Sequence, residues 1–338
     1  MNSLVIGISV VLLLAIFFML FRVQSLISVL KGSYNKKGGT SNQINAILFP
    51  IFFIVFCSLV IWYSGKATEH YLPKSASAQG ILTDNLFWLV TGVILFAFVA
   101  TNILLFSFPY TYQYKENRKA YFFPDNHKLE IIWTIIPAIV LSVLVFFGWR
   151  LWTDIQSPAP KNAVVLEITG KQFNWIVRYP GKDGKLGAYN FRLIDATNEV
   201  GIDFTDKASF DDFLPREIHI PKGTPVQFKI RARDVLHSVF LPHFRQKMDA
   251  VPGMPTTLWF TPIYTTDEMK SITGNPSFKY ELACTEVCGR GHFGMKFIVV
   301  VDEPEDFEKW YGSQEPFIKQ NPDYLANLPV TTKELAIK

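Results

Sequence analysis

Hydrophobic residues follow two different patterns along this chain of 338 residues. In the first 152 residues they form four long apolar runs, at about 4–21, 46–62, 87–106 and 131–152. Each run approaches the roughly 20 residues that an α-helix needs to cross the hydrocarbon core of a membrane. The pattern therefore predicts a membrane α-helical anchor of four transmembrane helices over residues 1–152.

The first run has a second interpretation, a secretory signal that is removed after export. No basic residue precedes this run, and no small-residue cleavage pattern follows it. We therefore interpret it as a retained helix. The composition agrees with a membrane protein, because 49% of residues are hydrophobic and only 18% are charged.

Lys and Arg are concentrated in two of the three loops between the runs. The first and third loops hold four each, whereas the second holds only Lys66 and Lys74. By the positive-inside rule the first and third loops are cytoplasmic, so everything after residue 152 lies outside the cytoplasm. The basic surplus is thus a signal of membrane topology, and no nucleic-acid motif accompanies it.

From about residue 153 the apolar residues come in short segments rich in β-branched side chains. Examples are 164–169, 226–230 and 297–301, and Pro and Gly turns separate such segments. This pattern predicts an all-β sandwich or barrel of Greek-key type over 153–311. Residues of about 180–215 are polar and rich in turn formers, which indicates a surface insertion. We expect 312–338 to be a tail that lies on this domain or on a neighbouring subunit.

The segment 284–295 concentrates metal-ligating side chains: Cys284, Cys288, His292 and Met295. His237 lies upstream, after the predicted strand 226–230, where it can close the site. Thiol and imidazole ligands favour copper or zinc over hard cations. Zinc seldom recruits Met, whereas a His/Cys set with a weak Met ligand is typical of copper electron-transfer sites, so copper is favoured.

A disulfide is the main alternative for Cys284 and Cys288, because paired cysteines outside the cytoplasm commonly oxidise. A structural disulfide would need neither His237 nor His292 nor Met295. The full set therefore favours a metal site.

Taken together, these residues resemble the copper A site of subunit II of haem–copper cytochrome c oxidases. The resemblance rests on Cys284-x-Glu286-x-Cys288-x-x-x-His292-x-x-Met295 and on the stretches 130–137, 170–175, 234–238 and 249–253. It implies a cupredoxin-like domain that binds two copper ions bridged by the thiolates of Cys284 and Cys288. His237 and Met295 would complete the coordination of one copper. His292 and the backbone carbonyl of Glu286 would complete that of the other.

The resemblance implies further roles for two acidic residues. The Glu286 side chain would bind a magnesium ion shared with subunit I, although an acid between two cysteines is more often solvent-facing. Glu130 would mark the mouth of a proton-uptake channel into subunit I. Without the resemblance, Glu130 reads as an interfacial acid favoured by a helix N-terminus.

Two aromatic residues are candidates for the surface where electrons enter. The family usually has Trp-Tyr-Trp there, whereas this chain has Phe173-Asn174-Trp175. Phe173 would occupy the position that receives electrons and Trp175 the third position. Core packing is an equally good interpretation for Trp175.

By this resemblance the chain is the electron-transfer subunit of a terminal cytochrome c oxidase, an oxidoreductase that translocates protons. It would accept electrons from cytochrome c and pass them to haem in subunit I, where oxygen is reduced to water. We expect other oxidase subunits and membrane lipid as further partners, and a bacterial plasma membrane as the location.

Basic residues crowd the predicted copper end of the domain: Arg231, Arg233, Arg245, Lys247 and Arg290. They would steer a basic soluble cytochrome c poorly. A membrane-tethered or complex-bound cytochrome c is therefore the expected donor.

Three other functions are alternatives to an oxidase subunit. A membrane-anchored copper chaperone of the thioredoxin-like type needs βαβ elements and a His downstream of its cysteines, whereas His237 lies upstream. A nitrous-oxide reductase shares the copper ligands, but the four helices and the stretch 130–137 argue against it. A quinol-oxidase subunit II would usually lack Cys284, Cys288 and His292.

Overall fold

The computed structural model describes residues 2–32, 39–68 and 71–327. They fall into two compact units, Met1–Tyr71 with Thr91–Pro137, and Leu72–Val90 with Ala138–Lys338. Residues 328–338 of the predicted tail lie outside the described residues.

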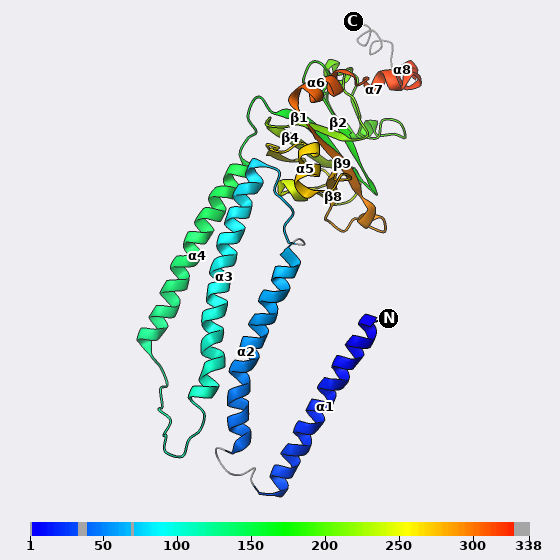
Figure 1. Cartoon of the computed structure of the whole chain (residues 1–338). Helices are drawn as coiled ribbons and strands as arrows, with labels where there is room; N and C mark the ends of the chain where they lie inside the picture. The colour runs from blue at the N-terminus through cyan, green and yellow to red at the C-terminus, as the bar shows by residue number, and fades with distance from the viewer. Residues whose placement is uncertain (1, 33–38, 69–70, 328–338) are drawn as a thin grey trace. The chain divides into compact units, whose positions relative to one another are not determined.

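Four long helices occupy the first part of the chain (Figure 1): α1 (Asn2–Leu30), α2 (Thr40–Ala67), α3 (Ala78–Thr111) and α4 (His127–Gln156). Within the described residues, all four are long and apolar enough to cross a membrane. Each helix is longer than the apolar run that predicted it, because it continues into polar residues at its ends.

Aromatic packing joins α2 to the second half of α3. The Phe106 ring lies 5.2 Å from the ring of Phe53, in a stacked arrangement, and 5.7–5.9 Å from those of Phe52 and Phe49. Such aromatic contacts add specific attraction beyond the burial of apolar area. The two helices therefore pack as a pair within the first unit.

The second unit contains a β-sandwich of two sheets. One sheet has the order β2-β1-β4-β7 and the other β3-β9-β8-β5-β6. The strands are β1 (Val164–Lys171), β2 (Asn174–Arg178), β3 (Ile218–Pro221), β4 (Val226–Ala232), β5 (His237–Leu241), β6 (Gln246–Ala250), β7 (Thr256–Phe260), β8 (Tyr280–Cys284) and β9 (Lys296–Asp302). Two pairings, β1 with β4 and β3 with β9, are parallel. The predicted fold class, a membrane helical anchor followed by an all-β cupredoxin-like domain, is confirmed.

Alternating side chains build the core between the sheets. On β4, Val226, Phe228 and Ile230 are buried, whereas the residues between them are at least partly exposed. This alternation follows from the two-residue period of a strand. Helices α5 (Thr266–Thr273) and α6 (Pro304–Gly312) pack against this domain at β9.

The beginning of α3 is fastened to the turn between β5 and β6. Arg245 forms two charge-assisted hydrogen bonds to the carboxylate of Asp84, at 2.7 and 3.0 Å. The Ser77 hydroxyl donates to the carbonyl of Phe244 and accepts from the amide of Gly80. A Cβ on Gly80 would lie 3.1 Å from the Phe244 carbonyl, so the close approach favours glycine here.

The insertion and the chain's last described helices share a small hydrophobic core of their own. Phe204 and Ile202 of the insertion pack with Phe317 and Ile318 of α7 (Phe317–Gln320), and Tyr324 of α8 (Pro322–Asn327) lies against them. Two 3₁₀ turns, η3 (Phe191–Leu193) and η4 (Lys207–Ser209), shape the insertion. The segment after residue 312 therefore supports the insertion.

A buried ion-pair network ties the insertion to the first sheet. The Arg178 guanidinium contacts Glu167 and Asp212, each at 3.1 Å, and Arg231 contacts Glu167 at 2.7 Å. Burial raises the pKa of Asp212 to about 7, although Arg178 and the amide of Gly187 oppose this shift. Loss of hydration outweighs the ion pair because the Asp212 side chain is fully buried.

Candidate metal centre

Neighbouring strands of the second sheet bring the first two candidate ligands together. His237 is the first residue of β5, and Cys284 is the last residue of β8. The two strands pair with each other, and Val239 of β5 lies opposite Cys284. The chain then forms a loop over 285–295 that carries the remaining candidates. Gly289 has a φ of 132° in this loop, a conformation that side-chain-bearing residues rarely adopt.

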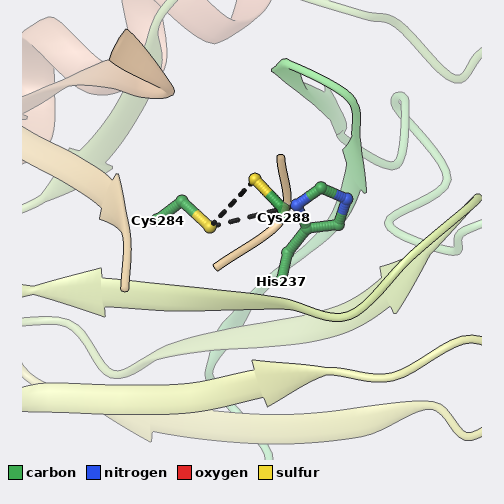
Figure 2. Close-up of side chains that lie close together, drawn as sticks. All are labelled: His237, Cys284 and Cys288. Carbon is green, nitrogen blue, oxygen red and sulfur yellow. Dashed lines mark hydrogen bonds between the residues drawn. The ribbon is translucent and has the colours of Figure 1, made fainter. Parts of the chain in front are cut away.

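The candidate donor atoms form one connected cluster. Cys284 Sγ lies 3.9 Å from both His237 Nδ1 and Cys288 Sγ, as Figure 2 shows. Cys288 Sγ lies 3.7 Å from His292 Nδ1 and 3.9 Å from Met295 Sδ. The backbone oxygen of Glu286 is 3.3 Å from Cys284 Sγ. The structure thus gathers the donor atoms of all six residues named from the sequence.

The two cysteines are free thiols in this arrangement. Their sulfur atoms are 3.9 Å apart, whereas a disulfide bond measures about 2.05 Å. Burial, together with the neighbouring Cys284, raises the pKa of the Cys288 thiol above its usual value. A bound cation would reverse this by stabilising the thiolates. Thiol, thioether and imidazole donors from two strand ends and one loop therefore fit a copper or zinc ion.

Asp234 holds the imidazole of His237 in one orientation. Its Oδ1 lies 2.8 Å from His237 Nε2, so Nε2 carries the proton and Nδ1 is left to face Cys284. The same carboxylate accepts hydrogen bonds from the amides of Val235 and Gln172. Burial alone would raise the pKa of Asp234, but these three bonds hold it below its usual value.

Gln172 links the turn after β1 to the loop of residues 285–295, here called the metal loop. Its side-chain amide donates to the carbonyl of Cys288, while its backbone amide donates to Asp234. Gln172 and Asp234 were not among the site residues predicted from the sequence. The sequence does show a carboxylate, Asp234, three residues before His237. Its hydrogen bonds to His237 and Gln172 can be seen only in the folded structure.

The two aromatic candidates lie in different environments. Phe173 is 41% exposed and its ring lies on the metal loop, where a Cβ on Gly291 would meet it at 2.5 Å. Trp175 is 1% exposed, and its indole N–H points to the carbonyl of Met295. Of these two residues only Phe173 is exposed enough to touch a docked protein, and the electron-transfer role of both residues remains a prediction.

Four of the five basic residues expected at this end form ion pairs, whereas Arg290 is exposed on the loop of residues 285–295 and forms none among the described residues. Arg231 pairs with Glu167, Arg233 with Glu199, Arg245 with Asp84 and Lys247 with Asp249. A tethered donor was expected because these cations were taken as exposed charge, and the ion pairs remove most of that support. Tethering of the donor remains a prediction.

The two acidic candidates occupy different parts of the molecule. Glu286 is half-buried on the metal loop, between the two cysteines. Glu130 lies in the first turn of α4, within the unit that includes Thr91–Pro137, with its carboxylate 3.8 Å from His127 Nδ1. The magnesium role of Glu286 and the proton-uptake role of Glu130 both remain predictions.

Comparison with known proteins places this geometry in a family. Residues 65–151 match the family described as "Cytochrome C oxidase subunit II, transmembrane domain", and residues 164–302 match "Cytochrome C oxidase subunit II, periplasmic domain". The chain belongs to the cytochrome c oxidase subunit II family. It is thus a subunit of a haem–copper oxidase, a membrane protein whose β domain lies outside the cytoplasm.

Relatives with curated names agree with this assignment. The alternative cytochrome c oxidase subunit 2 of Bradyrhizobium diazoefficiens is 33% identical over 247 residues, which cover 72% of this chain and 83% of the relative. The cytochrome c oxidase subunit 2 of Thermostichus vulcanus is 30% identical, over 79% of this chain and 85% of the relative. A solved structure, the periplasmic domain of subunit II of cytochrome oxidase from Bradyrhizobium japonicum, is 25% identical and covers 46% of this chain and 94% of that chain, with a TM-score of 0.32.

The family match does not extend over the whole anchor. It begins at residue 65, near the end of α2, so α1 and most of α2 precede it. The matched residues contain the whole of α3 and most of α4. The copper-chaperone alternative is not favoured.

Proposed function

We propose that this subunit II binds a dinuclear copper A centre and uses it to accept electrons from cytochrome c and deliver them to haem in subunit I. The observation that carries the proposal is the cluster of six donors, in which each cysteine sulfur lies within 4 Å of an imidazole nitrogen. Two thiolates shared by two coppers would let one electron spread over both metals, which keeps structural change on reduction small.

The protein's own part in this function is to hold the donors in place and exclude water. His237, Cys284, Cys288 and Met295 are buried, so their positions are set by packing before any metal binds. Asp234 fixes the ring of His237 through its Nε2–H. Rigid donors reduce the rearrangement that accompanies each electron transfer.

Three further roles complete the proposal. Electrons enter at Phe173, because its exposed ring lies directly on the metal loop. Glu286 offers its carboxylate to a magnesium ion, a hard cation that prefers oxygen ligands. Glu130 collects protons at the start of α4, since an ionisable group at a membrane boundary suits that task.

Copper stoichiometry and an EPR spectrum of the detergent-solubilised full-length chain test the proposal. Two coppers per chain and a seven-line pattern, from one electron shared by two equivalent nuclei, are expected. A Met295→Leu variant should alter this spectrum, whereas Met248→Leu, a matched change at a partly buried core methionine, should not. One copper per chain, or a Cys284–Cys288 disulfide that survives copper loading, would contradict the proposal.

A further inference from the structure

The insertion forms a hairpin-like arm whose tip lies at the metal end of the first sheet. Its base is the pairing of Tyr179 with Phe213, directly after the end of β2. Tyr189 pairs with Ile202 further along the arm. The tip, residues 190–201, then reaches Lys171, the last residue of β1, which lies next to Gln172 and Phe173.

Contacts at its two sides hold the tip in place. Glu199 pairs with both Lys171 and Arg233, and the Tyr189 ring lies 4.4 Å from the Arg231 guanidinium. The fully buried Asn198 side chain donates to the carbonyl of Ile202 and accepts from its amide, both at 2.8 Å. The tip is therefore a built element of the domain.

These contacts change the charge of the surface beside Phe173. Glu199 supplies one carboxylate to two cations, and Glu167 supplies another to Arg231. A charge paired in this way contributes little to the long-range field that steers a charged partner. One carboxylate between Lys171 and Arg233 leaves one excess positive charge, and Arg290, exposed on the metal loop, forms no ion pair among the described residues. The surface therefore keeps only a small net positive charge.

The tip also exposes apolar side chains. Phe191 is 65% exposed and Leu193 is 38% exposed, and both belong to η3 at the end of the arm. Asn190 pairs with Gly201, two residues from Glu199, so this turn lies close to the neutralised cations. Apolar side chains beside a surface whose charges are mostly paired are typical of a protein–protein contact.

We propose that the tip of the insertion is part of the surface on which the electron donor docks, and that this donor presents an apolar face of low net charge. The inference rests on the proposed function, because it assumes that electrons enter at Phe173. In the docked complex one electron leaves the reduced haem of the donor and reduces the metal centre. Phe191 and Leu193 supply contact area, and Glu199 reduces the positive charge of Lys171 and Arg233 beside them.

Rapid-mixing kinetics with the assembled oxidase in detergent test the docking role of Phe191. The probe is a soluble c-type cytochrome of near-neutral net charge, and the readout is the second-order rate constant for reduction of the copper centre. Phe191→Asp should lower this constant about tenfold, the effect of losing a central apolar contact. Phe191→Ala should lower it less, and because the side chain is mostly exposed neither variant should disturb folding.

Ile272→Asp is the matched control. Ile272 lies on α5 and is 48% exposed. The first residue of this helix, Thr266, accepts a hydrogen bond from the amide of Val301, so α5 packs at the end of β9 that is far from Met295. This variant should leave the rate constant unchanged. Reduction by ascorbate with a small mediator should be equal in all variants, since it requires no protein docking.

Salt dependence tests the role of Glu199. In the wild type, raising salt from about 20 to about 200 mM should change the rate constant less than about twofold, because few unpaired charges face the donor. Glu199→Gln uncovers Lys171 and Arg233, so reduction by a strongly basic cytochrome should become several-fold slower at low salt and recover at high salt.

The outcomes separate the two proposals. If Phe191→Asp and Ile272→Asp behave alike while the wild type is reduced by cytochrome, the docking inference is wrong and the electron-transfer function stands. If ascorbate reduces the wild-type centre but no cytochrome does, the proposed function itself is wrong.

Discussion

Replacing Asp234 by Asn tests whether this carboxylate positions His237 for metal binding. In the structure Oδ1 accepts from His237 Nε2 at 2.8 Å and from the Val235 amide at 2.7 Å, and Oδ2 accepts from the Gln172 amide at 2.7 Å. Asn keeps one acceptor oxygen, and its amide nitrogen cannot accept. At least one of the three N–H groups therefore loses its partner.

The size of the effect follows from these contacts. A buried donor left without its partner costs about 1–3 kcal/mol, and loss of a partner to a ligating His typically lowers metal affinity about 10- to 100-fold. The Asp234 side chain is 33% exposed, so water replaces part of the lost bonding. We therefore expect the lower end of that range, a loss of about tenfold or about 1.4 kcal/mol.

Copper affinity, measured by competition with a chelator on the full-length chain, is the assay. EPR of the loaded protein should also show that the two coppers have become less equivalent, since only one of them would use His237. Asp249→Asn is the matched control, because Asp249 bonds to Ser238 and Lys247 and does not touch His237. Equal affinity in Asp234→Asn and Asp249→Asn would refute the positioning role.

Two further predictions concern other parts of the chain. Glu130→Gln should slow turnover of the assembled oxidase several-fold while copper content stays unchanged, because the amide cannot carry protons; oxygen consumption and metal analysis check this. For Asp212, the folded pKa of about 7 lies above the unfolded value near 3.9, so between about pH 4 and 7 the folded state holds a proton that the unfolded state has lost. Stability should fall as pH rises through this window in the wild type but not in Asp212→Asn, as thermal unfolding at about pH 5 and about pH 8 would show.

Each of these predictions has its own control. Glu130→Asp keeps the acid and should retain turnover, and normal turnover in Glu130→Gln would remove the proton-uptake role. Asp306→Asn changes an exposed carboxylate on α6 and should preserve the wild-type pH dependence of unfolding. If Asp212→Asn loses stability between the two pH values as the wild type does, another group is responsible.

The features that could be predicted from the sequence are those with a local signature. An apolar run of membrane length and the two-residue alternation of a strand each reflect the environment of neighbouring residues, so the helices and the sandwich were predictable. The spacing from Cys284 to Met295 places four candidate ligands within twelve residues, which identifies the candidate site before any fold is known.

Other features depend on contacts between distant residues, which no local pattern records. Arg233 meets Glu199 and Arg245 meets Asp84 because the fold brings distant segments together, so cations expected to be free are paired. The same fold buries Trp175 while leaving the ring of Phe173 on the surface. The sequence by itself determined the membrane anchor, the sandwich and the set of candidate ligands. Only the tertiary structure decided which charges are neutralised, which ring faces a partner and where the insertion lies, because these depend on packing between segments far apart in the chain.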